Sequence, residues 1–320
     1  MRVTAIQFSR ALLAVLGGLA LLSVSPKAQG GQGGAAPAAA PAAPDFSKVE
    51  IKTTKVANNF YTLEGQGGMI GVLVGPDGVF MVDTQFAPLT PKIVAAVKQL
   101  SPLPIKFVVN THVHGDHTGG NENLAKMGAT IFSRDELRAG LASPPAAANG
   151  TPGVPAPPAA LPMVTYRGPV TFHMNGETVE LTPIPRAHTD GDTLVHFINA
   201  DVIMTGDFYR SVGFPNIDRI NGGSLNGMVN GLGVVIGMAG PNTKIIPGHG
   251  PTVDRTAVMA HRDMILALRD RVQQLVAQGK SQDDVLAAKL TSSYDAQVPQ
   301  AATTNDRFVG QLYAELKPRK

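Results

Sequence analysis

The sequence contains no cysteine and no tryptophan, and aromatic residues make up only 5% of its 320 residues. Without cysteine the protein forms no disulfide bond and has no thiolate to serve as nucleophile or metal ligand. The small number of aromatic rings argues against a surface on which sugars or nucleobases stack. A hydrophobic content of 43% nevertheless provides enough apolar residues for a large core.

The chain also lacks a real excess of charge. Its formal net charge is +3, but residues 1–28 contain Arg2, Arg10 and Lys27 and no acidic residue. The rest of the chain therefore has 24 of the 27 Lys and Arg residues and all 24 Asp and Glu residues, so its charges balance. Since a nucleic-acid-binding domain is expected to keep a basic excess, we predict a small-molecule substrate and no nucleic-acid partner.

The N-terminus has the pattern of a secretory signal peptide. Arg2 and Arg10 precede the uncharged apolar run "ALLAVLGGLALLSV" of 14 residues. That run is short for a membrane span and typical of the apolar segment of a signal, with Ala28 as a candidate last residue. We predict a signal peptide over residues 1–28, a periplasmic or secreted protein and no stable membrane span after processing. An uncleaved membrane anchor is the alternative interpretation.

Two further segments follow the signal. Residues 29–45 are rich in Ala, Pro and Gly and cannot form a packed core, so we predict a linker. Residues 46–320 are predicted to form one domain. The proline-rich stretch 143–162 is expected to be an exposed loop within that domain, because candidate functional motifs lie on both sides of it. The sequence leaves the oligomeric state open.

Short apolar runs alternate with helical patterns along the domain. "GVFMVD" follows the turn "PDG" and predicts one strand of a hairpin, and "IKFVVNT" is a near-continuous apolar run. Between them, residues 87–100 carry apolar side chains at helical spacing. Strands are also expected in "ETVELTPI", "DTLVHFI", "DVIMTGD" and "TKIIPG". The order indicates an α/β fold, with further helices after residue 251.

The stretch "NTHVHGDHTGG" (110–120) carries three of the eight histidines within six residues. His112 and His114 are separated by one residue at a strand end, so their side chains can point to the same side. Asp116 and His117 follow in the turn. Imidazole nitrogen and carboxylate oxygen are ligands that zinc uses, and the stretch therefore predicts a metal site.

Three more candidate ligands also follow apolar strands. His188 comes after "LTPIP", Asp207 after "DVIMTG" and His249 after "KII". Each taken alone could be a turn or capping residue; together with the histidine-rich stretch they form a set. The remaining histidines, His173, His196 and His261, are expected to be structural or solvated, and the charged face of the helix around His261 is expected to be exposed to solvent.

These segments, in this order, resemble the metallo-β-lactamase superfamily from about Val49 to Pro251. The resemblance implies an αβ/βα sandwich, here with extra C-terminal helices, and a site for two Zn²⁺ ions per chain at the loop edge of the sheets. By that match His112, His114 and His188 would bind one zinc, and Asp116, His117 and His249 the second. Asp207 would bridge both ions. Asp83, at the end of "GVFMVD", is similar to the family's aspartate that orients the metal loop without binding metal.

The resemblance also implies a hydrolytic reaction. Zinc lowers the pKa of bound water to near neutrality, so a hydroxide bridging the ions would be the nucleophile. Asp116 is predicted to position it and to pass its proton to the leaving atom, which makes Asp116 the catalytic residue. Met69, in the loop after "FYTLEGQGG", and Tyr209 and Arg210, directly after Asp207, are expected to contact substrate.

The sequence predicts a β-lactamase-like zinc hydrolase that cleaves an amide, lactone or ester bond in a small, carboxylate-bearing molecule. The aspartate at position 207 departs from β-lactamases with an all-histidine first site, which usually carry serine there. It resembles glyoxalase-II thioesterases and acyl-homoserine lactonases, which remain alternatives. A mononuclear-iron persulfide dioxygenase shares the HxHxDH pattern and is the alternative from another class of enzyme. Metal analysis would distinguish two zinc ions from one iron ion.

Overall fold

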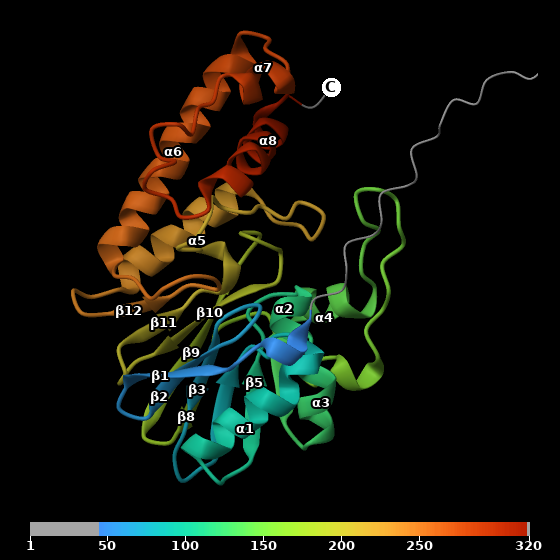
Figure 1. Ribbon diagram of the computed structural model, residues 1–320, viewed down its shortest axis with the longest axis vertical. Coiled ribbons are helices and arrows are strands. Elements are labelled where there is room, and N and C mark those ends of the chain that lie inside the picture. The colour runs from blue at the N-terminus through green and yellow to red at the C-terminus, as the bar shows by residue number, and fades with distance from the viewer. Residues whose placement is uncertain (1–44, 319–320) are drawn as a thin grey trace, which may run out of the picture. The chain divides into compact units, whose positions relative to one another are not determined.

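The computed structural model describes residues 45–318. The predicted signal peptide and all of the predicted linker except Asp45 lie outside the described residues. The described part of the chain contains two β-sheets and their covering helices (Figure 1). Within residues 45–318, no helix is both long and apolar enough to cross a membrane.

The first sheet has seven strands in the order β1-β2-β3-β4-β5-β6-β7. Its first four strands pair antiparallel and its last four pair parallel. The expected hairpin is present, since Gly71 pairs with Val82 and Leu73 with Phe80. The strands are β1 (Lys52–Ala57), β2 (Phe60–Glu64), β3 (Ile70–Leu73), β4 (Val79–Val82), β5 (Ile105–Val109), β6 (Thr130–Arg134) and β7 (Val164–Tyr166).

The second sheet has five strands in the order β12-β11-β10-β9-β8. Strands β8 to β11 pair antiparallel, whereas β11 and β12 pair parallel. The strands are β8 (Val170–Met174), β9 (Glu177–Ile184), β10 (Asp192–Phe197), β11 (Val202–Met204) and β12 (Lys244–Ile246).

Alternation along the strands builds separate apolar layers. In β4, Phe80 and Val82 face the second sheet, while Val79 and Met81 face the helices outside the first sheet. In β11 the middle residue, Ile203, faces the helices outside the second sheet. Because successive side chains of a strand point to opposite faces, each sheet is buried on both sides.

Helices cover the outer face of each sheet, so the expected αβ/βα sandwich is confirmed. Helices α1 and α3 pack on the first sheet, and α5, α6 and α8 pack on the second. Figure 1 shows α6, α7 and α8 forming a helical end beyond α5. The helices are α1 (Thr90–Leu100), α2 (Gly115–Thr118), α3 (Asn121–Lys126), α4 (Asp135–Ala142), α5 (Leu225–Met238), α6 (Arg255–Ala277), α7 (Gln282–Ala287) and α8 (Asn305–Leu316).

Local sequence signals account for several helix starts. The side chains of Ser224 and Asp254 accept hydrogen bonds from the backbone amides of Gly227 and Ala257 and cap α5 and α6. Ser281 caps α7 from its position before "QDDVLAA", with Asp284 completing a capping box. These bonds satisfy amides that a helix leaves without partners at its first turn.

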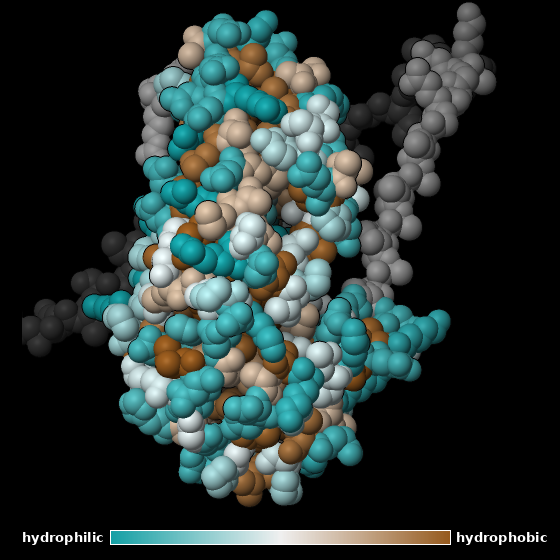
Figure 2. Space-filling view, turned by 90° about the vertical axis from the view of Figure 1, so that its left-hand side faces the viewer, coloured by the Kyte–Doolittle hydropathy of each residue, from teal (hydrophilic) through white to brown (hydrophobic). Residues whose placement is uncertain are grey.

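The surface is mixed in character. On the face drawn in Figure 2, apolar residues form small clusters between polar ones, from the helical end to the sheets. Scattered apolar residues are ordinary on a globular surface. The proline-rich stretch forms the expected loop, with one short 3₁₀ turn at Pro158–Ala160.

Candidate metal centre

Seven acidic and histidine side chains from four loops meet at one edge of the two sheets. The loops follow β5, β9, β11 and β12, which all end at that edge. We call this set the His–Asp cluster: His112, His114, Asp116, His117, His188, Asp207 and His249. Its members form three overlapping groups whose potential ligand atoms lie within 4.8 Å of one another, and these groups are able to hold metal ions.

One group consists of His112, His114 and His188. His188 Nε2 lies 3.0 Å from His114 Nδ1. His188 donates its Nδ1–H to the carbonyl oxygen of Asn216 at 2.7 Å, and His114 donates its Nε2–H to Asp218 at 2.7 Å. Because the outward nitrogens carry the protons, His188 Nε2 and His114 Nδ1 keep lone pairs that face the group.

A second group consists of Asp116, His117 and His249. His249 Nε2 lies 3.2 Å from Asp116 Oδ2 and 3.5 Å from His117 Nε2. On its other side His117 donates Nδ1–H to Asp83 at 2.7 Å. The His117 ring is therefore held in one orientation with Nε2 directed at the group.

Asp207 lies between the two groups. Its Oδ1 is 3.3 Å from Nε2 of both His117 and His249, and its Oδ2 is 3.9 Å from His188 Nε2. A third group of potential ligands, His112, His117 and Asp207, links the other two. The carboxylate thus presents one oxygen to each side of the cluster.

Unsatisfied polar atoms show that the cluster fits a cation. Among the described residues, His112 Nε2 and Asp207 Oδ1 are buried and have no hydrogen-bond partner. A buried acceptor without a partner costs about 1–3 kcal/mol, and a divalent cation would satisfy both atoms. The donor set of imidazole nitrogens and carboxylate oxygens suits zinc and other first-row metals.

The charge states of His112, His188 and Asp207 also favour a cation. Burial lowers the pKa of His112 well below its usual range and that of His188 to about 4, so both rings are neutral at pH 7. Burial opposes charge on Asp207, but His117 and His249 outweigh it and hold the pKa of the carboxyl well below its usual range. Neutral imidazoles and ionised carboxylates are the protonation states that bind metal.

The remaining residues of the second group are charge-coupled. Burial lowers the pKa of His117, but Asp83 and Asp207 outweigh it and raise that pKa well above its usual range. Burial raises the pKa of Asp116, and the neighbouring His249 and His117 bring it below its usual value. Asp116 is therefore ionised at neutral pH, as a proton acceptor must be.

Asp83 supports both groups from behind. It is 1% exposed and has the positive φ of 63° directly after β4. One carboxylate oxygen accepts the backbone amide of Thr111, and the other accepts the Thr111 hydroxyl and His117. The Thr111 oxygen in turn lies 3.1 Å from His112 Nδ1. This geometry agrees with the orienting role that the resemblance implies for Asp83.

Two orienting groups were not identified from the sequence. Asp218 and the carbonyl of Asn216 contact His114 and His188 from the loop between Asp207 and α5. The only local signal is the short polar stretch "PNIDR", which carries no recognisable motif. Hydrogen bonds from Asn221 and His114 hold the pKa of Asp218 below its usual value although burial opposes this.

The backbone at two glycines lies so close to the cluster that no side chain would fit there. A Cβ on Gly68 would lie 2.1 Å from the His117 ring, and a Cβ on Gly248 would lie 2.0 Å from Asp207 Oδ1. Glycine is therefore required at both positions for these side chains to keep their places. A Cβ on Gly115, within the histidine-rich stretch, would meet no described atom within 4 Å.

A cavity of about 600 Å³ adjoins the second group and is lined by His249, Met69 and Arg210. Met69 and Arg210, expected to contact substrate, thus lie beside the cluster, with Arg210 Nη1 4.0 Å from Asp207 Oδ2. A second cavity, of about 420 Å³, lies on the other side, between His114 and the proline-rich loop.

Tyr209 lies away from its expected position. It is 3% exposed, belongs to the core outside the second sheet, and packs edge-on against His261 at 4.9 Å between ring centroids. The face of α6 that carries His261 was expected to be exposed to solvent. It is partly buried instead, because His261 packs against Tyr209. At the end of the 3₁₀ turn Gly206–Phe208, both Phe208 and Tyr209 belong to this core, whereas Arg210 lies beside the cluster.

A family model described as the metallo-beta-lactamase superfamily matches residues 64–269, more than half of the chain. The protein belongs to this superfamily. The matched range includes the whole His–Asp cluster and ends within α6, so α7 and α8 lie outside it.

Solved structures give the same fold. The metallo-beta-lactamase from Pontibacter korlensis is 18% identical with a TM-score of 0.55, and the DIM-1 metallo-beta-lactamase is 18% identical with a TM-score of 0.56. Each match covers 68% of this chain and 99% of the other. The stereoselective inverting sec-alkylsulfatase Pisa1 from Pseudomonas sp. is 20% identical with a TM-score of 0.63. That match covers 84% of this chain and 52% of the alkylsulfatase, so this chain spans about half of that protein.

Proposed function

We propose that this superfamily member is a dinuclear zinc hydrolase that cleaves an amide, lactone or ester bond in a small, carboxylate-bearing molecule. One observation supports it most directly: Asp207 presents one oxygen to His117 and His249 and the other to His188. A carboxylate so placed can bridge two ions. In this proposal His112, His114 and His188 hold one zinc, and Asp116, His117 and His249 the other.

When bound, a pair of zinc ions supplies an activated water and polarises the scissile carbonyl group. The protein residues then have distinct tasks. Asp116 Oδ2, beside His249 Nε2, accepts the proton of the attacking water and returns it to the leaving atom. Asp83 and Asp218 hold His117 and His114 in the ligating tautomer.

Substrate is proposed to enter the cavity beside His249. Arg210 lines this cavity and provides positive charge, and Met69 provides an apolar contact. Lys52 also lines the cavity but pairs with Glu64 there. A guanidinium matches a carboxylate with two parallel hydrogen bonds, so Arg210 is the proposed anchor for the substrate's acidic group.

The bond that is cleaved is tested with a panel of substrates. An aspartate at position 207 resembles glyoxalase-II thioesterases and acyl-homoserine lactonases more than β-lactamases. A thioester or an acyl-homoserine lactone is therefore the second candidate substrate, beside a β-lactam. The panel therefore contains a chromogenic cephalosporin, an acyl-homoserine lactone, a glutathione thioester and a secondary alkyl sulfate, the last prompted by the alkylsulfatase similarity. If the protein hydrolyses none of the first three compounds, or only the alkyl sulfate, the proposed substrate class is contradicted.

Metal analysis tests the cofactor independently of the substrate. The purified protein is expected to contain two zinc ions per chain by elemental mass spectrometry. One iron ion per chain would instead support the persulfide dioxygenase interpretation and would refute the hydrolase.

We also propose that the protein works in the periplasm or outside the cell, on the basis of the N-terminal signal pattern. Cell fractionation and N-terminal sequencing of the mature protein test this proposal. A chain that starts at Met1 and stays in the cytoplasm would contradict it.

A further inference from the structure

The loop from Phe214 to Asp218 makes two hydrogen bonds to imidazole rings of the His–Asp cluster. The carbonyl oxygen of Asn216 accepts the Nδ1–H of His188, and Asp218 accepts the Nε2–H of His114, both at 2.7 Å. Two of the three imidazoles in one potential metal group are therefore oriented by residues two positions apart. A displacement of this loop would turn both rings.

The C-terminal segment holds this loop and the residue before it through hydrogen bonds to successive backbone groups. Pro299 and Thr304 bind the backbone amides of Gly213 and Phe214, at 2.6 and 2.8 Å. Arg307 donates to the carbonyl oxygens of Phe214 and Pro215, at 3.2 and 3.4 Å. The loop therefore takes its shape from residues far away in the sequence.

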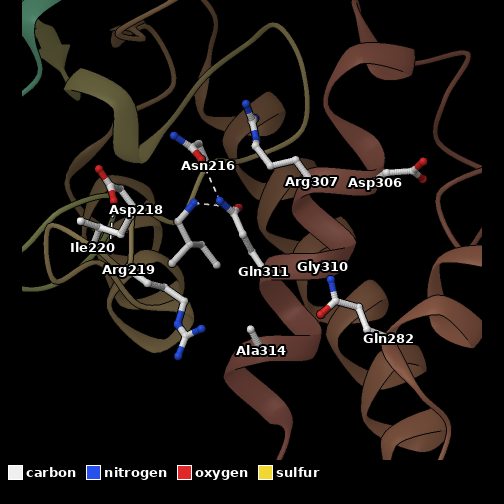
Figure 3. A pocket seen from close by; sticks show the side chains of 11 residues that line it. Asn216, Asp218, Arg219, Ile220, Gln282, Asp306, Arg307, Gly310, Gln311 and Ala314 are labelled. Atoms are coloured by element: carbon white, nitrogen blue, oxygen red, sulfur yellow. Dashed lines mark hydrogen bonds between the residues drawn. The ribbon is translucent and has the colours of Figure 1, made fainter. Parts of the chain in front are cut away.

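Gln311 of α8 makes the contacts nearest to the cluster (Figure 3). Its Oε1 accepts the backbone amide of Ile217 at 3.0 Å, and its Nε2 donates to Asn216 Oδ1 at 2.8 Å. The amide group of one side chain thus fixes Asn216, which makes one of the two contacts to the imidazoles, and Ile217, which lies between them. Leu312 and Phe308, both fully buried, anchor α8 in the core and give Gln311 a rigid base.

Helix α8 lies outside the part of the chain that the superfamily model matches. The superfamily match ends at residue 269, whereas α8 covers Asn305–Leu316. An element outside the matched range therefore reaches the supports of the cluster. Gln311 and Gln282 of α7 both line a cavity of about 500 Å³. Gln282 makes no hydrogen bond to the loop among the described residues.

We propose that Gln311 is a positioning residue for the metal site formed by His112, His114 and His188. This inference rests on the metal centre of the proposed function. Gln311 acts through Asn216 and Asp218: by fixing the loop, it keeps His188 Nε2 and His114 Nδ1 directed at the ion. The second group, which includes His117 and His249, has no hydrogen bond to this loop among the described residues and should be independent of Gln311.

The test is a cobalt(II) titration of the chelator-treated full-length protein, followed by absorbance. Gln311→Met keeps the length of the side chain and removes both hydrogen bonds. Loss of an outer hydrogen bond to ligating histidines costs about 10–100-fold in metal affinity, and one step further away we expect about tenfold. One of two equivalents should bind about tenfold more weakly and the other unchanged.

Gln282→Met is the matched control, since it makes the same change in the same cavity without loss of a bond to the loop. It should titrate like the wild type. Gln311→Glu keeps the acceptor for the Ile217 amide, and the Asn216 side-chain amide can turn to donate to it. This variant should recover most of the affinity, and it also serves if Gln311→Met fails to fold.

The outcomes separate this inference from the proposed function. Two unaltered equivalents in a folded Gln311→Met protein would overturn the positioning role and leave the dinuclear centre standing. Equal weakening of both equivalents, or the same loss in Gln282→Met, would also overturn it, because a general destabilisation would then be the cause. A wild-type protein that binds no cobalt would overturn both proposals.

Discussion

Asp83 Oδ2 accepts the Nδ1–H of His117 at 2.7 Å, and both side chains are almost completely buried. The same carboxylate accepts the amide and the hydroxyl of Thr111, whose oxygen contacts His112. One aspartate directly after β4 thereby sets the orientation of two histidines in the segment that follows β5. The hydrogen bond between Asp83 and His117 links the hairpin of the first sheet to the cluster.

Asp83→Asn should weaken metal binding without changing the fold. The amide would keep the shape but could place an N–H group against His117 Nδ1 and no longer favour the ligating tautomer. We expect a loss of about 10–100-fold in zinc affinity, measured by competition with a chromophoric chelator. Asp77→Asn, at the opposite end of the same hairpin, is the control. Wild-type affinity in Asp83→Asn would contradict the orienting role.

Asp207→Ala should lower the metal content from two ions towards one. The substitution removes the only carboxylate of the described residues that faces both groups of the cluster. Elemental analysis of the purified variant measures the effect. An unchanged content of two ions would show that Asp207 does not bridge them.

Asp116→Ala should lower the turnover number by at least about 10²-fold, the scale of a positioned acid–base group. Asp116→Asn keeps the size and removes the proton acceptor, so it should lose a similar factor. The turnover number is measured with whichever panel compound the wild type hydrolyses, at saturating zinc so that metal loss does not contribute. Wild-type turnover in either variant would exclude Asp116 as the proton acceptor.

Gly248→Ala should damage the cluster, because the added Cβ would lie 2.0 Å from Asp207 Oδ1 and 2.7 Å from the Gly206 carbonyl carbon. Since backbone and carboxylate cannot both stay in place, we expect at least about tenfold weaker metal binding. Gly115→Ala is the matched control, because its Cβ would meet no described atom within 4 Å. Equal behaviour of the two variants in a zinc titration would refute this explanation.

His261 should make the stability of the protein depend on pH. Burial lowers the pKa of His261 to about 4, whereas an unfolded histidine titrates near 6.5. Between these values only the unfolded state takes up the proton, so the contribution is present above pH 6.5 and is lost as pH falls towards 4. The loss is at most about 3 kcal/mol.

Urea unfolding of the chelator-treated protein at pH 7 and pH 4.5 measures this effect. His261→Phe keeps an aromatic ring against Tyr209 and removes the titrating group, so its free energy of unfolding should fall less over this interval. The same fall in both proteins would show that His261 is charged in the folded state.

The local pattern of the sequence predicted the strands it named and the α/β class correctly, and the resemblance to the superfamily implied the sandwich. Alternating or continuous apolar runs such as "GVFMVD" and "DVIMTGD" specify strands, because burial of one or both faces of a sheet selects the residues. The first residue of a helix was harder to predict from the sequence. Residues 87–100 had a helical pattern, but Ala87–Leu89 form a 3₁₀ turn before α1. The seven side chains of the cluster could be chosen because each follows such a run.

The sequence by itself determined which chemical groups are available and that they follow strand ends, because side-chain type and apolar period are local properties. Only the tertiary structure decided that Tyr209 turns into the core and that Asp218 and Asn216 set the proton positions of His114 and His188. It also decided that Gln311 of α8 supports them. The physical reason is that an irregular loop takes its shape from long-range hydrogen bonds, and no pattern within "PNIDR" records a partner almost a hundred residues away.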